Sequence, residues 1–190
     1  DDSATTNYNI AIGLDALKGG DFSASNKTLQ GNIAIGHQAL DATSTTTSIG
    51  QIAIGHLALG AVSADSKNTA VGYLSGQAID DGGYNTLLGF QALATADGGE
   101  SNNVAIGYYA MQAVNHDNSD GNIAIGVNAA KGGSTNAMIG CVAIGTDAMT
   151  STSTNAQTGT IAIGHQSGKN ITTGASNTLI GYGSGSAIDT

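Results

Sequence analysis

The sequence predicts an all-β solenoid, in which short coils stack and each coil contributes a parallel strand. A five-residue phrase, seen as Asn32-Ile33-Ala34-Ile35-Gly36, recurs ten times at spacings of 17 to 23 residues. The phrase itself is nearly constant, while the segments between its copies vary in length and composition. Repetition of this period along a whole chain is typical of solenoid proteins. We therefore expect about ten coils in a single repeat domain covering residues 1–190.

Each phrase ends in glycine, and this glycine is position 0 of the repeat. Position −1 is always Ile, Val or Leu, and position −3 is always β-branched. Position −2 is Ala except at Leu87 and Leu179, and position +3 is always Ala or Ser. The structural repeat glycines are Gly13, Gly36, Gly55, Gly72, Gly89, Gly107, Gly126, Gly145, Gly164 and Gly181.

The alternation within the phrase predicts a β-strand. Positions −3 and −1 share one face of a strand and position −2 lies on the other, and β-branched residues suit such a pleated surface. A face reduced to Ala and Gly has to be approached closely, either by another wall of the same coil or by another chain. A helix fits less well because the apolar run is short and ends at glycine each time.

The segments between phrases predict turns and surface loops. Residues 41–47 and 97–102 are rich in Ser, Thr, Asn, Asp and Gly, which are turn residues, and insertions in a solenoid map to surface loops. Position −4 is a column of asparagines that would stack from coil to coil and form amide hydrogen-bond ladders: Asn9, Asn32, Asn68, Asn85, Asn103, Asn122 and Asn177.

The apolar content of the coil predicts an oligomer. The phrase makes only about a third of each coil apolar, so a lone three-walled prism would bury unpaired polar walls at high cost. A flatter coil, with one inner strand and one more exposed strand, avoids this. Several chains would then pool their small-residue faces around a common axis, and we expect a homotrimer.

Composition excludes several classes of function. The net charge is −9, with five basic residues and no Arg, so no nucleic acid is expected as a partner. No apolar run reaches the length of a membrane span, and the single Cys141 excludes a disulfide framework. A chain that begins at Asp1 without Met is expected to be the mature part, or a fragment, of a longer fibrous protein.

The chain offers little for catalysis or cofactor binding. No nucleophile–base pairing and no zinc spacing is present, so we expect neither an enzyme nor a cofactor. His37, His56 and His165 each follow a phrase glycine, and in a trimer this column would form rings around the axis that bind an anion or a metal. The mixed residue types of the column favour instead a half-buried slot for medium-sized side chains. The oxygen-rich run 115–121 indicates a turn rather than a Ca²⁺ site.

Two segments carry a resemblance to a known family. Val104-Ala105-Ile106-Gly107-Tyr108-Tyr109-Ala110 and residues 161–167 resemble the head repeat of trimeric autotransporter adhesins, the YadA-like head. The resemblance covers all ten copies and implies a trimeric, left-handed parallel β-roll on a bacterial cell surface. Residues 68–73 also resemble the shafts of some phage tail fibres and environmental surface proteins, which implies a virion surface.

The resemblance implies an extracellular structural or adhesive fibre segment. Its loops would attach to a host-surface protein or glycan, with no direct insertion into a membrane. The alternative is a purely architectural spacer or a self-assembling filament subunit, including a tail-fibre shaft, whose coils stack end to end because the open ends of a β-stack are unpaired edges.

Overall fold

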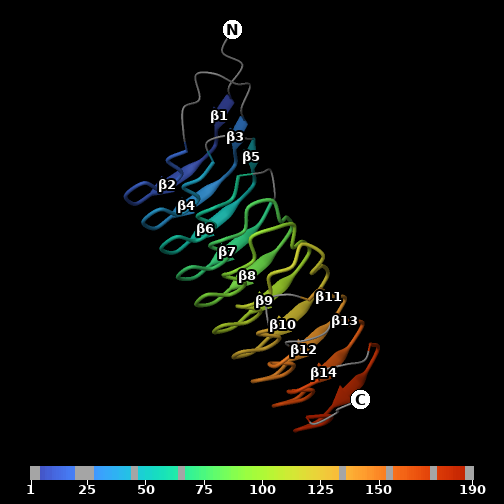
Figure 1. Ribbon diagram of the computed structural model, residues 1–190. Helices are drawn as coiled ribbons and strands as arrows, with labels where there is room; N and C mark the ends of the chain where they lie inside the picture. Colours follow the sequence, from blue (N-terminus) through green and yellow to red (C-terminus); the bar gives the residue numbers. More distant parts are fainter. Residues whose placement is uncertain are drawn as a thin grey trace.

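The chain folds as an all-β solenoid of stacked parallel strands (Figure 1). The computed structural model describes residues 5–19, 28–43, 47–63, 67–132, 136–152, 156–171 and 175–186. These residues contain 15 strands and no helix. Ten strands form one parallel sheet, and the other five form sheets of three and two strands. The all-β solenoid predicted from the repeat is therefore confirmed.

The main sheet consists of positions −3 to −1 of the ten phrases. Each position pairs with the same position of the next phrase, so that Ala34 lies opposite Ala53 and Ile35 opposite Ile54. This register is kept along the whole sheet, whose strands follow one another in chain order. They are β2 (Ile10–Ile12), β4 (Ile33–Ile35), β6 (Ile52–Ile54), β7 (Thr69–Val71), β8 (Thr86–Leu88), β9 (Val104–Ile106), β10 (Ile123–Ile125), β12 (Val142–Ile144), β14 (Ile161–Ile163) and β15 (Thr178–Ile180).

A second, shorter wall precedes the phrase in five coils. One small sheet contains β1 (Thr5–Asn7), β3 (Thr28–Gln30) and β5 (Ser48–Ile49), and the other β11 (Met138–Ile139) and β13 (Gln157–Thr158). In β3 the central Leu29 is buried and its two neighbours are half-buried. These strands are the second strands expected of a flat coil, but they are not the more exposed ones. Strand β3 is buried to the same degree as β4, and β5, β11 and β13 each bury one of their two residues.

Tight turns join these segments at three positions of the repeat. Positions −5, +2 and +4 have left-handed φ in every copy, between 45° and 70°. Position −5 is Gly in five of the ten repeats, but Tyr8, Lys67 and Tyr84 adopt the same conformation at this position. Hydrogen bonds between neighbouring coils hold the strained residues, as where the Leu40 N–H donates to the Ala58 carbonyl at 3.0 Å. The local cost of a left-handed residue is about 1–2 kcal/mol, so these bonds matter in every coil.

The core lies between the main sheet and the segment that returns after the glycine. It contains the small residues of positions −2 and +3 together with larger side chains at +4 and +7. The largest of its fully buried apolar side chains are Leu40, Leu59, Ile79, Leu87, Leu93, Met111, Met149 and Ile171. The bulky residues of −3 and −1 point the other way and are half-buried or exposed in all ten strands.

This arrangement corrects one expectation about the strand faces. The small-residue face is not pooled among several chains, because Ala34, Ala53 and Ala70 are fully buried within the single chain. The wall that approaches this face belongs to the same coil. The physical reason is the thinness of the coil, in which a return segment that carries Leu or Met leaves room only for Ala opposite it.

The phrase glycines are required by close contact between coils. A Cβ placed on Gly55 would lie 2.2 Å from the carbonyl oxygen of Gly72 in the next coil. The φ of Gly55 is also +139°, a region that side chains rarely allow. The same two constraints recur at the other phrase glycines, except that the last, Gly181, has open space where a Cβ would be.

The asparagine column forms the predicted hydrogen-bond ladder. The Asn85 Oδ1 atom accepts the backbone N–H of Asn103 at 2.9 Å, and its Nδ2 atom donates to the Glu100 carbonyl at 2.8 Å. In the same way, the side-chain oxygen at position −4 accepts the backbone N–H of position −4 in the next repeat, from Asn9 as the first acceptor to Cys141 as the last donor. Gln51 takes one of the asparagine places. The ladder satisfies buried backbone groups that the turn at −5 leaves unpaired.

Candidate interaction face

The outward side of the main sheet is a continuous surface without Asp, Glu or Lys that is largely apolar, called here the outer face. It consists of the columns at positions −3, −1 and +1 of the ten repeats. Ile12, Leu88 and Ile180 of the −1 column are 59%, 48% and 66% exposed. Because the register of the sheet is unbroken, each column runs straight along the solenoid. No described strand carries a charged residue. The −1 column is entirely aliphatic, and the −3 column is aliphatic except at Thr69, Thr86 and Thr178.

The +1 column of the outer face contains a stack of five rings from His37 to Tyr108, called here the ring column, and a separate stacked pair further along. Centroid distances are 5.0 Å for His37–His56, 5.1 Å for His56–Tyr73, 5.2 Å for Tyr73–Phe90 and 5.3 Å for Phe90–Tyr108. These spacings follow the separation of neighbouring strands. The ring faces cover one another, so the column presents ring edges to solvent.

The three histidines of the +1 column do not lie together. His37 and His56 are neighbours, with their Nδ1 atoms 3.1 Å apart. His165 lies six strands further along the sheet and stacks on Tyr182. His37 and His165 are exposed, so this position is more open than the half-buried slot that the sequence favoured. Over the described part of the chain, no group of three or more His, Cys, Asp or Glu is placed to hold a metal ion.

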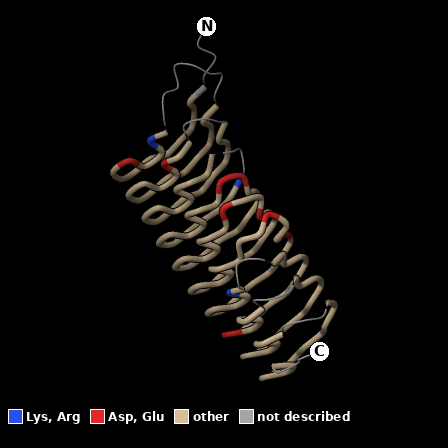
Figure 2. The backbone as a smooth tube through the Cα atoms, viewed as in Figure 1, with Lys and Arg blue, Asp and Glu red and all other residues tan. Residues whose placement is uncertain are grey.

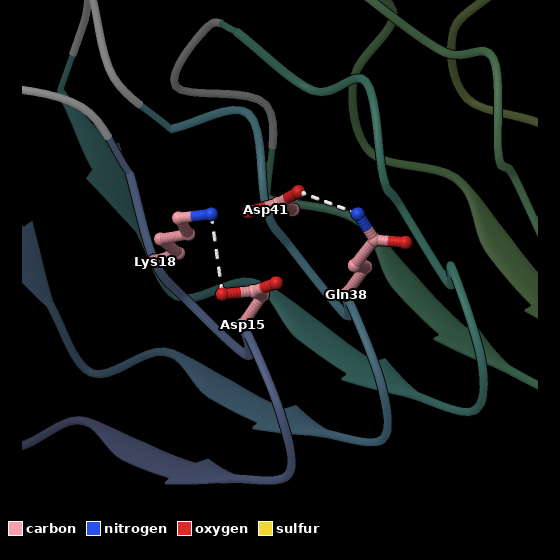
Figure 3. A network of polar contacts seen from close by, with 4 residues as sticks. All are labelled: Asp15, Lys18, Gln38 and Asp41. Carbon is pink, nitrogen blue, oxygen red and sulfur yellow. Dashed lines mark hydrogen bonds and ion pairs between the residues drawn. The ribbon is translucent and has the colours of Figure 1, made fainter.

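Charged residues gather away from the outer face, in turns and loops (Figure 2). On the return segments of the first two coils, the Lys18 Nζ atom lies 3.2 Å from the Asp15 carboxylate, and the Gln38 Nε2 atom donates to the Asp41 carboxylate at 3.3 Å (Figure 3). Both pairs join positions +2 and +5 of their own coil. The solenoid therefore has a polar margin beside an apolar sheet face.

The run 115–121 forms a turn, as the sequence indicated. The Ser119 N–H donates to the His116 carbonyl at 2.7 Å, and the Asn118 N–H donates to His116 Nδ1 at 3.2 Å. The Asp120 carboxylate accepts the backbone N–H of Ser101 in the preceding coil at 2.8 Å. This carboxylate thus holds two coils together.

Two buried groups have shifted protonation equilibria. Burial raises the pKa of the Glu100 carboxyl, and the nearby Asp117 carboxylate raises it further. Burial also raises the pKa of the Cys141 thiol, which takes an asparagine position in the −4 column. Neither group lies on the outer face, and both belong to the interior of the coils.

The outer face runs along all ten strands of the main sheet. The described residues enclose no pocket, and none of them forms a helix of the length and apolarity that spanning a bilayer requires. Comparison of the chain with protein-family models, with curated proteins and with solved structures found no match.

Proposed function

We propose that the chain is an extracellular structural or adhesive fibre segment that assembles as a homotrimer through its outer face. The observation that carries this proposal is the long, uncharged and largely apolar surface of positions −3, −1 and +1. Its ten strands span about 45 Å, and the three columns are about 13 Å wide, which gives roughly 600 Å². A patch of this size lies at the upper end of what monomeric proteins expose.

The shape of the outer face suits a second copy of the same face. Its side chains repeat at the strand spacing, so copies placed side by side with parallel axes would interdigitate along their whole length. Burial of apolar surface contributes about 25 cal/mol per Å². The resemblance to the autotransporter head repeat supports three chains and a left-handed roll, and it is the reason to propose a bacterial cell surface or a virion as the location.

Ligand attachment is assigned to the loops between phrases. They vary in length while the phrase does not, and most of the acidic residues lie in them or in the turns. A trimer would present each loop three times, and avidity multiplies weak contacts without requiring a deep site. A host-surface protein or a glycan is the class of partner that this arrangement suits.

The second candidate function is an architectural spacer or filament subunit. The strands β2 and β15 are the two edges of the main sheet. Unpaired edges of a parallel stack can pair with a strand of another molecule, and such pairing is the physical ground for this second candidate.

Sedimentation velocity on the purified chain tests the proposal. We expect a trimer at micromolar concentration, and a Lys placed at Ile106 in the middle of the outer face would disperse it because a charge would be buried in the interface. Thr158→Lys, at an exposed position of β13, is the matched control and should leave the trimer intact. A folded monomer at this concentration would contradict the proposal.

Two further measurements separate the candidate functions. Binding of the trimer to cells or to a glycan array favours attachment through the loops. Growth of fibres in a purified solution, seen by electron microscopy, favours the filament subunit.

A further inference from the structure

We propose that His37 and His56 form a bidentate site for a late divalent transition-metal ion, with copper(II) bound most tightly. The two residues occupy the same +1 position of adjacent coils, and their Nδ1 atoms are 3.1 Å apart. Both lie within one chain, so no other chain has to supply a ligand, and their +1 column is the outermost of the three columns of the outer face, beside the turn at +2.

The distance between the two nitrogens matches that of two ligands on one metal ion. Metal–imidazole bonds are about 2.0–2.1 Å long. Two such nitrogens with an angle at the metal between a right angle and a tetrahedral angle are about 2.9–3.4 Å apart. The planes of the His37 and His56 rings differ by 6°, so the two in-plane lone pairs run nearly parallel. Opposed rotations of the two rings about their side-chain bonds would turn both lone pairs onto one ion.

The solenoid holds the two histidines in place before any ion binds. The His37 carbonyl accepts the Leu57 N–H at 2.9 Å, and the His56 carbonyl accepts the Leu74 N–H at 2.9 Å. The His56 ring also stacks on Tyr73, with centroids 5.1 Å apart. A site whose ligands are held by strand pairing loses little conformational entropy on binding.

The chemistry of the pair favours a metal ion over other ligands. The two Nδ1 atoms lie within hydrogen-bond distance of each other, and a bound ion would take the place of a hydrogen between them, with both Nδ1 atoms unprotonated. Imidazole suits copper, nickel and zinc, and copper binds most tightly in this series. His37 is exposed and His56 half-buried, so water can complete the coordination. The net charge of −9 favours a cation.

The chain supplies a matched control for this site. His165 occupies the same +1 position, but the coils on either side carry Thr146 and Tyr182 there. It therefore has the same backbone setting and no second imidazole. Replacement of His165 removes one histidine without removing a chelate.

Titration calorimetry of the purified chain with copper(II), nickel(II) and zinc(II) chloride tests the inference. We expect one ion per chain, with copper bound most tightly. Either His37→Ala or His56→Ala should weaken copper binding by about 100-fold, because the second ligand acts at high effective concentration. His165→Ala should leave the affinity unchanged, and thermal melts would show that each variant is folded.

Electron paramagnetic resonance of the copper-loaded chain gives an independent readout. Two nitrogen ligands are expected in the unmodified chain and in His165→Ala, and fewer in the other two variants. Equal affinity of all three variants and the unmodified chain, or no binding by the unmodified chain, would overturn the inference. A stoichiometry of one ion per three chains would also overturn it, since that indicates a ring of symmetry-related histidines.

Discussion

The side chain of Leu87 fills the space that Gly76 leaves open in the preceding coil, since a Cβ on Gly76 would lie 2.7 Å from Leu87 Cδ1. Leu179 stands in the same relation to Gly168, where the corresponding distance is 3.2 Å. These are the two phrases with Leu in place of Ala at position −2. At these two places the side-chain volume missing at position +4 of one coil is supplied by position −2 of the next coil. The combined volume of the two positions is therefore kept, although the size of each side chain changes.

This compensation predicts a rescue. Leu87→Ala leaves a cavity and should lower the free energy of unfolding by about 2–5 kcal/mol. Gly76→Leu crowds the core and should lower it by about 1–3 kcal/mol. Combining the two should restore much of the loss, and adding Ile79→Val should restore more, because the arrangement of Leu59, Val62 and Ala70 then recurs one coil later.

Urea unfolding of the single, double and triple variants measures the coupling. The double variant is expected to be more stable than the sum of the single losses implies. Strict additivity of the two single losses would contradict the packing relationship.

The phrase glycines should tolerate substitution much less than other glycines. A Cβ on Gly107 would lie 2.4 Å from the Gly126 carbonyl oxygen, and its φ is +137°. Gly107→Ala should therefore cost more than about 3 kcal/mol, if the variant folds at all. Gly140→Ala is the control, because its φ of +61° is shared by other residue types at position −5 and its Cβ would meet nothing.

Chemical unfolding compares the stability of the two variants. For a variant that does not fold, the yield of soluble protein with a β-type circular dichroism spectrum is compared instead. Gly140→Ala should cost about 1–2 kcal/mol. Similar losses for both variants would contradict the role of the close contact between coils.

The strands were predictable from the sequence, whereas the direction of their faces was not. The alternation of Ile33, Ala34 and Ile35 locates a strand and assigns its two faces, but both faces are apolar. The usual expectation that larger residues lie inside fails here because a thin coil has room only for Ala. The inner Leu40 and Leu59 belong to a regular +4 column, and this signal could have identified the second half of the core.

Other features needed the three-dimensional register. The left-handed turn at −5 has a partial signal in Gly31 and its equivalents, but Tyr8 and Lys67 carry none. The contact between His37 and His56 follows from their equal phase in adjacent repeats, which the sequence contains. The stacking of rings in direct contact depends on strand spacing that the sequence alone does not specify.

The stability should depend on pH through Glu100. This carboxyl is buried, its Oε2 atom accepts the Gly98 N–H at 3.1 Å, and its Oε1 atom has no partner. Burial raises its pKa in the folded state. The folded chain then binds more protons than the unfolded chain between the ordinary carboxyl pKa and the raised one. The contribution of Glu100 to stability is therefore greatest in acid and falls as the pH rises through this interval.

Comparison with Glu100→Gln isolates this contribution from that of other carboxyls. The amide stays neutral, so the stability of this variant relative to the unmodified chain should increase from acid to neutral pH and then level off. Thermal melts between pH 4 and pH 8 measure the difference. Asp81→Asn, at an exposed position, is the control and should show no such trend. A constant difference for Glu100→Gln would contradict the effect of burial.

The asparagine ladder is interrupted at Cys141, and its repair should stabilise the protein. The thiol faces the backbone N–H of Thr160, which an asparagine Oδ1 would accept at this place in the ladder. The amide Nδ2 would reach the Gln157 carbonyl, the equivalent of the Met138 carbonyl that Asn122 reaches at 2.7 Å. Cys141→Asn should therefore raise the free energy of unfolding by about 1 kcal/mol.

A gain of this size corresponds to an increase in Tm of about 2–4 °C for a chain of this length. Cys141→Ala removes the thiol without adding ladder bonds, so it should lower or leave unchanged the Tm. Asn103→Ala, which breaks three side-chain hydrogen bonds in the middle of the column, should cost about 1–3 kcal/mol because buried polar groups lose their partners. If Cys141→Asn melts no higher than Cys141→Ala, the ladder bonds do not stabilise the stack, because the two variants differ only in the amide.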